Sequence, residues 1–420
     1  MSFDTISVIG LGYIGLPTAA AFASRQKHVV GVDVNQRAVD TINRGEIHII
    51  EPDLARLVKS AVDDGYLRAV TRPEAADAFL IAVPTPFKDG HEPDLTYVRA
   101  AALSLAPILK PGDLVILEST SPVGTTEQMA LWLADARPDL HFPQTAGELA
   151  DINIAYCPER VLPGKIVAEL IKNDRVIGGM TPRCSARASE LYRLFLEGEC
   201  VITGSRTAEM CKLTENSFRD VNIAFANELS LICAEQGINV WELIRLANRH
   251  PRVNILQPGP GVGGHCIAVD PWFIVAQNPQ QARLIRTARL VNDDKPAWVV
   301  EQVKSAVAEC LFETNKRAGE VIIACFGLAF KPDIDDLRES PAVSIVQRIV
   351  SWHQGTTLVV EPNVRQLPEA LAGHAALTAL EDALNRADVL VMLVDHRQFK
   401  ALPPSAIRQK WLVDTRGVWR

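Results

Sequence analysis

The chain has 420 residues, of which 48% are hydrophobic and 22% are charged. This is the composition of a globular protein with room for two or three domains, and it excludes a disordered or collagen-like chain. The net charge of −7 argues against a general nucleic-acid binder and against binding to anionic membranes. We therefore expect neither nucleic acid nor membrane as a partner.

Cysteine use and the N-terminal stretch favour a cytoplasmic protein. The 8 cysteines form no CxxC pair and no cluster with histidine, so we expect reduced thiols and no metal site. No apolar run reaches the roughly 18–20 residues that span a bilayer. The apolar stretch 6–23 lacks a basic leader and is broken by glycines and Pro17, which favours a strand, a turn and a helix over a signal peptide.

In chain order, the first half alternates short apolar runs with helical stretches. Each run is apolar throughout, as in parallel strands that are buried on both faces. The predicted strands are 5–9, 29–34, 78–83, 114–118 and 152–156. This alternation predicts a doubly wound sheet.

The middle of the chain changes to a helical pattern. One long helix is predicted over 205–236 and a second helical region over 280–311, before further strands at 322–326, 357–360, 389–393 and 411–413. The predicted fold class is α/β, with two Rossmann-like doubly wound parallel-sheet domains joined by a long central helix. The predicted domains are 1–204, 205–312 and 313–420.

A glycine-rich turn follows the first strand. The sequence GLGYIG at 10–15 is the dinucleotide-binding fingerprint in its required context between a strand and a helix. Asp33 closes the second strand, where a carboxylate binds both adenosine ribose hydroxyls and repels a 2′-phosphate. This favours NAD over NADP, although Arg37 would offset part of that repulsion.

Polar residues also follow the third and fourth strands. Thr85, in the sequence VPTP at 83–86, could donate to the cofactor, and a rigid loop without a ligand is an equally good interpretation. The segment 118–126 carries several hydroxyls that we expect to point toward the same crevice, because ligands of such sheets lie at the carboxyl ends of the strands.

The predicted central helix carries a polar stripe. Lys212, Asn216 and Asp220 are spaced at four-residue intervals with Arg219 alongside, so they share one face. Two interpretations stay open: a solvated face, or a partly buried stripe in which a lysine with a lowered pKa acts as an acid–base or electrostatic group.

The sequence PGPGVGGHC at 258–266 presents one cysteine from a loop. Its glycines and prolines exclude a helix or a central strand, and Asp270 follows four residues after Cys266. A cysteine presented in this way is a candidate nucleophile. The other cysteines lie in apolar or helical contexts, and we expect them to pack.

Six motifs together carry a resemblance over essentially the whole chain. They are GLGYIGLP at 10–17, STSPVGTT at 119–126, CPER at 157–160, KLTEN at 212–216, GGHCIAVDP at 263–271 and GLAFKPDIDDLRES at 327–340. In this order they resemble the nucleotide-sugar dehydrogenase family, which includes UDP-glucose and GDP-mannose 6-dehydrogenases. The sequence PERVLPG at 158–164 is similar to the branch that acts on UDP-N-acetylhexosamines, and UDP-N-acetyl-D-mannosamine is the expected sugar.

The resemblance implies an activity and an assembly. Residues 1–204 would bind NAD, 205–312 would connect and dimerise, and 313–420 would bind the UDP-sugar, in a homodimer. Each sugar would undergo a four-electron oxidation of its C6 alcohol to a carboxylate, with two NAD consumed. The uronic acid would serve a bacterial surface polysaccharide of the enterobacterial common antigen type.

The resemblance also assigns roles to residues. Cys266 would trap the aldehyde as a thiohemiacetal and then a thioester, Lys212 and Asn216 would stabilise the oxyanion, and Asp270, Glu159 and Thr120 would order water and relay protons. The expected cofactor contacts are Gly10, Gly12, Tyr13, Ile14, Gly15, Asp33, Arg37, Thr85, Thr126 and Arg338. The expected substrate contacts are Arg160, Val161, Lys212, Asn216, Arg219, His250, Arg252, Gly263, Phe330, Lys331 and Arg416.

Three alternatives stay open. UDP-N-acetylglucosamine differs from the expected sugar only at C2, whereas Pro163 stands where glucose-type members carry a second carboxylate, which counts against UDP-glucose. A two-electron hydroxyacid dehydrogenase would need neither Cys266 nor a second nucleotide-binding sheet. A non-catalytic nucleotide-sugar sensor would not need the combined set of Lys212, Asn216, Cys266 and Asp270.

Overall fold

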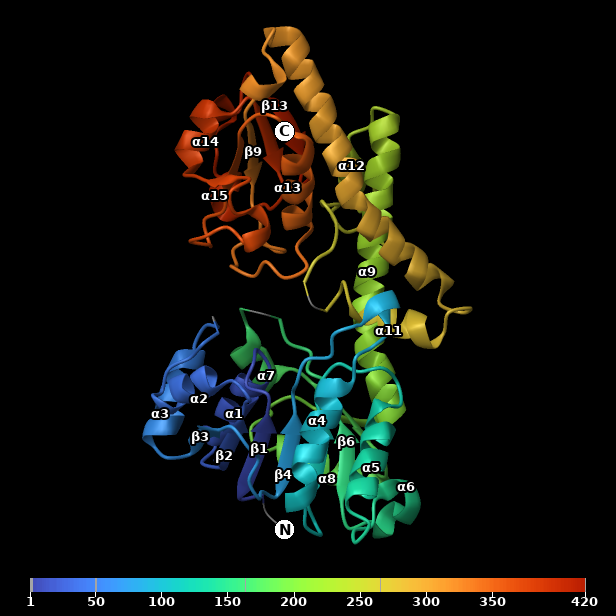
Figure 1. Ribbon diagram of the computed structural model, residues 1–420. Helices are drawn as coiled ribbons and strands as arrows, with labels where there is room; N and C mark the ends of the chain where they lie inside the picture. Colours follow the sequence, from blue (N-terminus) through green and yellow to red (C-terminus); the bar gives the residue numbers. More distant parts are fainter. Residues whose placement is uncertain (1–2, 50, 163, 265, 420) are drawn as a thin grey trace. The chain divides into compact units, whose positions relative to one another are not determined.

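The computed structural model describes residues 3–49, 51–162, 164–264 and 266–419. The chain divides into two compact units, Met1–Glu215 and Asn216–Arg420. Helix α9, Ser205–Glu235, crosses this boundary (Figure 1), which matches the long helix predicted over 205–236. No helix in the described part of the chain is both long and apolar enough to cross a membrane.

The first unit is built on an eight-stranded sheet in the order β3-β2-β1-β4-β5-β6-β7-β8. Its strands are β1 Thr5–Ile9, β2 His28–Val32, β3 Leu67–Val70, β4 Ala78–Ile81, β5 Leu114–Leu117, β6 Asn153–Tyr156, β7 Arg175–Gly179 and β8 Cys200–Gly204. Strands β1 to β6 pair in parallel, as predicted. The β6–β7 pair is antiparallel, because the chain re-enters the sheet at the end where β6 leaves it.

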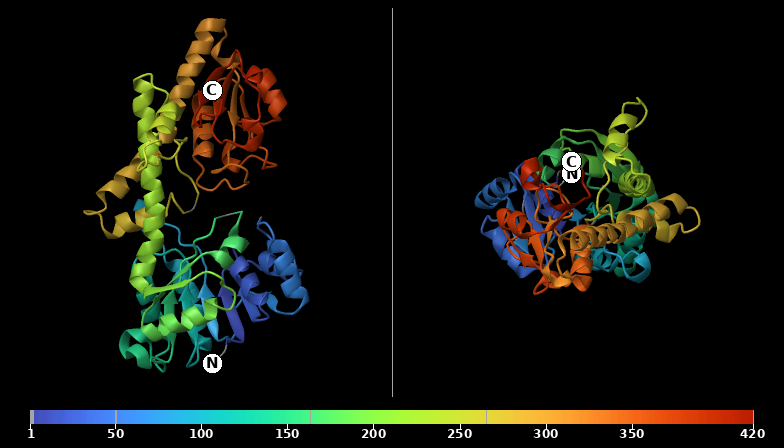
Figure 2. Two further views of the ribbon diagram at one scale, coloured as in Figure 1. Left: turned by 180° about the vertical axis from the view of Figure 1, so that it is seen from behind. Right: turned by 90° about the horizontal axis from the view of Figure 1, so that it is seen from above.

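Helices cover both faces of this sheet (Figures 1 and 2). They are α1 Gly15–Ala23, α2 Gln36–Asn43, α3 Leu54–Asp63, α4 Thr96–Leu105, α5 Thr125–Ala136, α6 Pro143–Ala146, α7 Ile166–Lys172 and α8 Pro182–Tyr192. One core packs α1, α3, α7 and α8 against the sheet around Phe22 and Tyr192. A second core packs α4 and α5 on the other face around Met129 and Leu133. Burial on both faces explains why the predicted strands are apolar throughout.

The second unit contains a five-stranded parallel sheet in the order β11-β10-β9-β12-β13. Its elements are α10 Val240–Ala247, α11 Asp270–Gln277, α12 Arg283–Thr314, β9 Ile323–Phe326, α13 Pro341–Trp352, β10 Thr357–Val360, β11 Ala376–Leu377, α14 Leu380–Arg386, β12 Val389–Met392, α15 Arg397–Lys400 and β13 Trp411–Asp414. Helices α12 and α13 pack on one face, and α14 and Phe399 of α15 pack on the other. The two Rossmann-like sheets and the long helix confirm the predicted fold class.

Four strands have no counterpart in the sequence prediction. Strand β8 is an edge strand with exposed Val201 and Ile202, β3 alternates in burial, and β11 is 2 residues long. Strand β7 has the sequence RVIGG, in which an arginine and two glycines obscure the apolar pattern. Its Arg175 is nevertheless buried.

Candidate active site

The predicted dinucleotide turn has the geometry that a pyrophosphate needs. Gly10 has φ +90°, a backbone conformation that favours glycine. A Cβ on Gly15 would overlap the Gly10 carbonyl oxygen, whereas a Cβ on Gly12 would meet open space. Helix α1 begins at Gly15, so its N-terminus lies directly behind the open turn. These residues therefore fit a dinucleotide phosphate.

Asp33 fixes this turn through its carboxylate. Its Oδ2 accepts from Leu11 N at 3.0 Å, and its Oδ1 accepts from Asn35 N at 2.9 Å. The half-buried carboxylate keeps acceptor capacity for a ribose, because each oxygen has two lone pairs. Arg37 is exposed in the first turn of α2.

The loops after β4 and β5 are tied to each other. The Thr85 hydroxyl donates to the Thr120 carbonyl, and the Ser119 hydroxyl donates to the Val83 carbonyl at 2.8 Å. Thr126 is buried and its hydroxyl donates to Glu209 of α9 at 2.6 Å. The expectation that the hydroxyls of 118–126 point into a crevice is wrong for Ser119 and Thr126, because they hold the loops and the helix α9 in place.

Beneath these loops lies a buried ion cluster. Arg175 Nη2 lies 2.9 Å from Glu118 Oε1 and 2.6 Å from Glu159 Oε2. The Tyr192 hydroxyl donates to Glu118 at 2.6 Å, and the guanidinium stacks 4.1 Å above the Tyr192 ring centroid. Burial raises the pKa of Glu118 to about 7, and Arg175 opposes that rise.

This cluster determines how Lys212 is held. The Lys212 ammonium donates to the Glu159 main-chain carbonyl at 2.7 Å, while the Glu159 side chain points to the buried Arg175. Each oxygen of the Glu159 carboxylate has a protein partner, Arg175 or the Arg160 main-chain N–H, and keeps a further lone pair, so its water-ordering role stays a prediction. Arg160 pairs with Glu215 at 2.7 Å, and Val161 packs on the core beside α1. Pro163 lies outside the described residues.

In the second unit, Cys266 lies in a turn that leads into α11. The thiol-bearing residue is half-buried, and its carbonyl accepts from Val269 N at 3.0 Å and Asp270 N at 2.8 Å. Asp270 is the first residue of α11 and is 2% exposed. The Asn216 carboxamide of α9 donates to its Oδ2. The candidate nucleophile Cys266 and the buried Asp270 carboxylate thus lie one turn of the chain apart.

The polar stripe of α9 is partly buried. Asp220 is fully buried in an ion pair with Arg289 of α12 at 2.6 Å, whereas Arg219 is exposed. The structure therefore shows that this face is partly buried, with Asp220 buried and Lys212 and Asn216 half-buried; the acid–base or electrostatic role of Lys212 stays a prediction. Each residue of the stripe binds a partner: Lys212 binds the Glu159 carbonyl, Asn216 binds Asp270 and Asp220 binds Arg289.

The glycine loop contacts the predicted UDP-binding residues. A Cβ on Gly263 would overlap the Glu339 carbonyl and approach Phe330, and Gly264 N donates to the Arg338 carbonyl at 3.2 Å. Phe330 and Lys331 are half-buried. The Arg338 guanidinium pairs with Asp336. His250 and Arg252 lie exposed after α10, where Arg252 N donates to the His250 ring at 3.3 Å.

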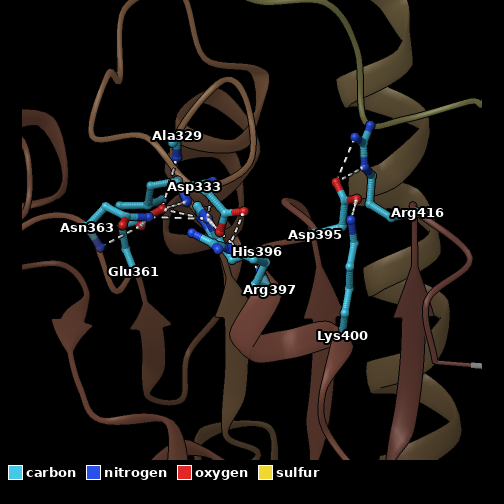
Figure 3. Close-up of polar contacts among 10 residues, drawn as sticks. Ala329, Asp333, Glu361, Asn363, Asp395, His396, Arg397, Lys400 and Arg416 are labelled. Carbon is cyan, nitrogen blue, oxygen red and sulfur yellow. Dashed lines mark hydrogen bonds and ion pairs between the residues drawn. The ribbon is translucent and has the colours of Figure 1, made fainter. Parts of the chain in front are cut away.

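Arg416 is held by a carboxylate that sequence reasoning missed. Asp395 pairs with Arg416 Nη2 at 2.7 Å and with Lys400 at 2.6 Å (Figure 3). Beside it, Glu361 accepts from Leu328 N at 2.7 Å and pairs with His396 at 3.0 Å. Glu361 follows β10 as Asp33 follows β2. Each carboxylate accepts from the main-chain N–H of a leucine that comes directly after a strand and a glycine. This repeat, in which Gly-Leu follows one strand and an acidic residue follows the next strand along the chain, is a sequence signal that points to Glu361.

The comparisons with known proteins agree across the chain. It matches the UDP-glucose/GDP-mannose dehydrogenase family in three successive parts: the NAD binding domain at residues 4–196, the central domain at 206–294 and the UDP binding domain at 324–420. It is 78% identical over 420 residues to the UDP-N-acetyl-D-mannosamine dehydrogenase of Yersinia pestis, and 77% identical to that of Escherichia coli (strain K12), with 100% of each chain covered.

A solved structure gives the same result. The UDP-D-ManNAc dehydrogenase from Pyrococcus horikoshii has a TM-score of 0.88 and 39% identity, covering 99% of this chain and 96% of that chain. The matched NAD binding domain contains the glycine turn and Asp33. The chain therefore belongs to the UDP-glucose/GDP-mannose dehydrogenase family and is an NAD-dependent dehydrogenase.

Proposed function

We propose that the protein oxidises UDP-N-acetyl-D-mannosamine at C6 to the uronate in two successive two-electron steps. The full-length similarity to relatives that carry this activity in their names supports the sugar. The half-buried Cys266 in its glycine loop supports the second step, because a simple alcohol oxidation needs no thiol.

The residues suit this sequence of steps. When bound, NAD would supply the hydride acceptor, with one molecule of NAD consumed in each of the two oxidations. The Cys266 thiolate adds to the aldehyde carbon to give a thiohemiacetal, whose oxidation yields a thioester that water cleaves, releasing the carboxylate and restoring the thiol. Asp270, buried and oriented by Asn216, would take up a proton.

We assign Lys212 the electrostatic role. Its ammonium is oriented by the Glu159 carbonyl, so it can stabilise an oxyanion without reorganising during the reaction. Glu159 would position Lys212 through its main-chain carbonyl. The Glu159 carboxylate and Thr120 would help to order the attacking water and relay protons, as the resemblance implies. Arg416, fixed by Asp395, and Lys331 would bind the diphosphate, for which a guanidinium fork is well suited.

The sugar and the electron count are tested together. The protein is incubated with NAD and, separately, UDP-N-acetylmannosamine, UDP-N-acetylglucosamine or UDP-glucose, and the product acid and the NADH formed per sugar are measured. We expect two NADH per UDP-N-acetylmannosamine and the corresponding uronate. One NADH per sugar would instead indicate a two-electron dehydrogenase, and preferred oxidation of the glucosamine epimer would change the substrate.

Asp33 predicts the cofactor preference. In NADP, a 2′-phosphate replaces the ribose hydroxyl that would donate to Asp33. The carboxylate, which Leu11 N and Asn35 N hold in place, would also repel the phosphate. We expect a preference for NAD over NADP of at least roughly tenfold in kcat/KM, about 1.4 kcal/mol. Steady-state kinetics with each cofactor measure it. Equal use of NADP would mean that Arg37 outweighs Asp33.

We further propose a homodimer that forms through α9. Phe218, Phe225 and Ile232 lie seven residues apart on this helix, and they are 68%, 52% and 44% exposed. Such a spacing places them on one face, which a second copy could cover about a two-fold axis. A cytoplasmic location accords with a thiol nucleophile, which a reducing compartment keeps unoxidised.

Replacing Phe218 and Phe225 together by glutamate should make the protein monomeric. Two charges would have to be buried in the apolar contact, which is unfavourable without partners. Light scattering at micromolar concentration measures the mass of the variant. Leu149→Glu, at an 86% exposed position, is the control and should stay dimeric; a monomeric unmodified protein would refute the assembly.

A further inference from the structure

A buried chain of hydrogen bonds links α9 and α12 to the glycine loop. Asp220 and Asn227 of α9, and Arg289 and Asn292 of α12, are each at most 1% exposed. Arg289 donates to Asp220 Oδ1 at 2.6 Å, and Asn292 Nδ2 donates to the same oxygen at 2.8 Å. Asn227 Nδ2 donates to Asn292 Oδ1 at 2.8 Å. Finally, Gly259 N donates to Asn227 Oδ1 at 2.9 Å.

The carboxylate sets the direction of the whole chain. Because Asp220 accepts from the Asn292 amide nitrogen, Asn292 must present its oxygen to Asn227. Asn227 must then turn its own oxygen to the loop, where only a donor such as Gly259 N satisfies it. A buried carboxamide with both ends used has one low-energy orientation, since an unsatisfied end is costly.

The loop is therefore attached to α9 on both sides of the nucleophile. Asn227 binds it at Gly259, seven residues before Cys266, and Asn216 binds it at Asp270, four residues after. A Cβ on Gly259 would lie 2.5 Å from Arg416 Nη1, so the backbone there packs closely against this arginine. A shift of the loop at Gly259 would therefore move the Cys266 thiol and would also disturb Arg416, a proposed substrate-binding residue.

We propose that Asn227 is a positioning residue for the Cys266 nucleophile, acting through Gly259. This rests on the proposed function, in which the thiol must reach the aldehyde before it leaves. Without the Asn227 anchor, the first oxidation proceeds, but the thiol captures the aldehyde inefficiently. The specific consequence is released aldehyde and fewer than two NADH per sugar.

The experiment uses Asn227→Ala in the full-length protein. We expect turnover to fall by roughly tenfold to a hundredfold, as for a modest misplacement of a reacting group. NADH per sugar should fall from two toward one, with aldehyde trapped by semicarbazide. Asn222→Ala is the matched control, because its carboxamide donates to the Phe218 carbonyl of the same helix at 2.7 Å; it should give two NADH and no trapped aldehyde.

Further variants separate positioning from general destabilisation. Asn292→Ala should give the same leakage, and the Asn227→Ala/Asn292→Ala pair should add little, because either change interrupts one chain. If Asn227→Ala does not fold, Asn227→Ser replaces it in the experiment. The serine variant should release less aldehyde than Asn292→Ala. A slower Asn227→Ala enzyme that still yields two NADH without aldehyde would overturn the proposal. Cys266→Ser with a full yield would instead overturn the proposed function.

Discussion

Cys266→Ser should still fold but should lose turnover by at least roughly a thousandfold, because a serine hydroxyl is a far weaker nucleophile than a thiolate at neutral pH. The substitution changes little volume in a half-buried turn. NAD should still bind, since the glycine turn and Asp33 belong to the other unit. The first hydride transfer can survive, so a stalled adduct or bound aldehyde should accumulate.

Steady-state NADH production and intact-protein mass after mixing with substrate measure this prediction. The control is Cys325→Ala, in the core of the second sheet. Burial raises the pKa of Cys325 to about 12 and raises the pKa of Cys157 still further, so neither is a thiolate at neutral pH. Near-normal turnover with two NADH per sugar from Cys266→Ser would remove the cysteine from the mechanism.

Arg175→Met should lower the free energy of unfolding by about 3–5 kcal/mol, because it leaves the buried Glu118 and Glu159 carboxylates without their cation. Turnover should fall too, since Glu159 also holds Lys212. Urea unfolding followed by fluorescence measures the stability. Arg206→Met is the control: this exposed arginine pairs with Glu127 at 2.7 Å, and its loss should leave the free energy of unfolding nearly unchanged.

The loss in free energy of unfolding that Arg175→Met causes, its stability deficit, should depend on pH. Burial already raises the pKa of Glu118 to about 7 against the opposing charge of Arg175, and removing that charge raises it further. The folded state then holds a proton that the unfolded chain releases near its usual pKa of about 4.5. Stability of the variant therefore falls as pH rises, and the deficit should be larger at pH 8 than at pH 5.5. An equal deficit at both pH values would contradict this account.

Local sequence predicted the features that depend on neighbouring residues. The strands β1, β4, β5 and β10 are visible as short apolar runs, and α9 as a long helical pattern. The glycine turn before α1 and the loop carrying Cys266 follow from the backbone freedom of glycine. In each case the residues that form the feature lie within a few positions of one another, so periodicity and composition are sufficient.

Only the tertiary structure determined which polar groups meet. A buried arginine and a surface arginine look alike in sequence, so nothing marked Arg175, whose partner Glu118 is 57 residues away. For the same reason, no local pattern indicates that Glu159 binds Arg175, or that Gly259 N donates to Asn227, 32 residues away in the chain. Burial makes such pairs obligatory, because an unpartnered charge or amide in the interior is costly. The pairing itself depends on how the strands and helices pack, which no local pattern records.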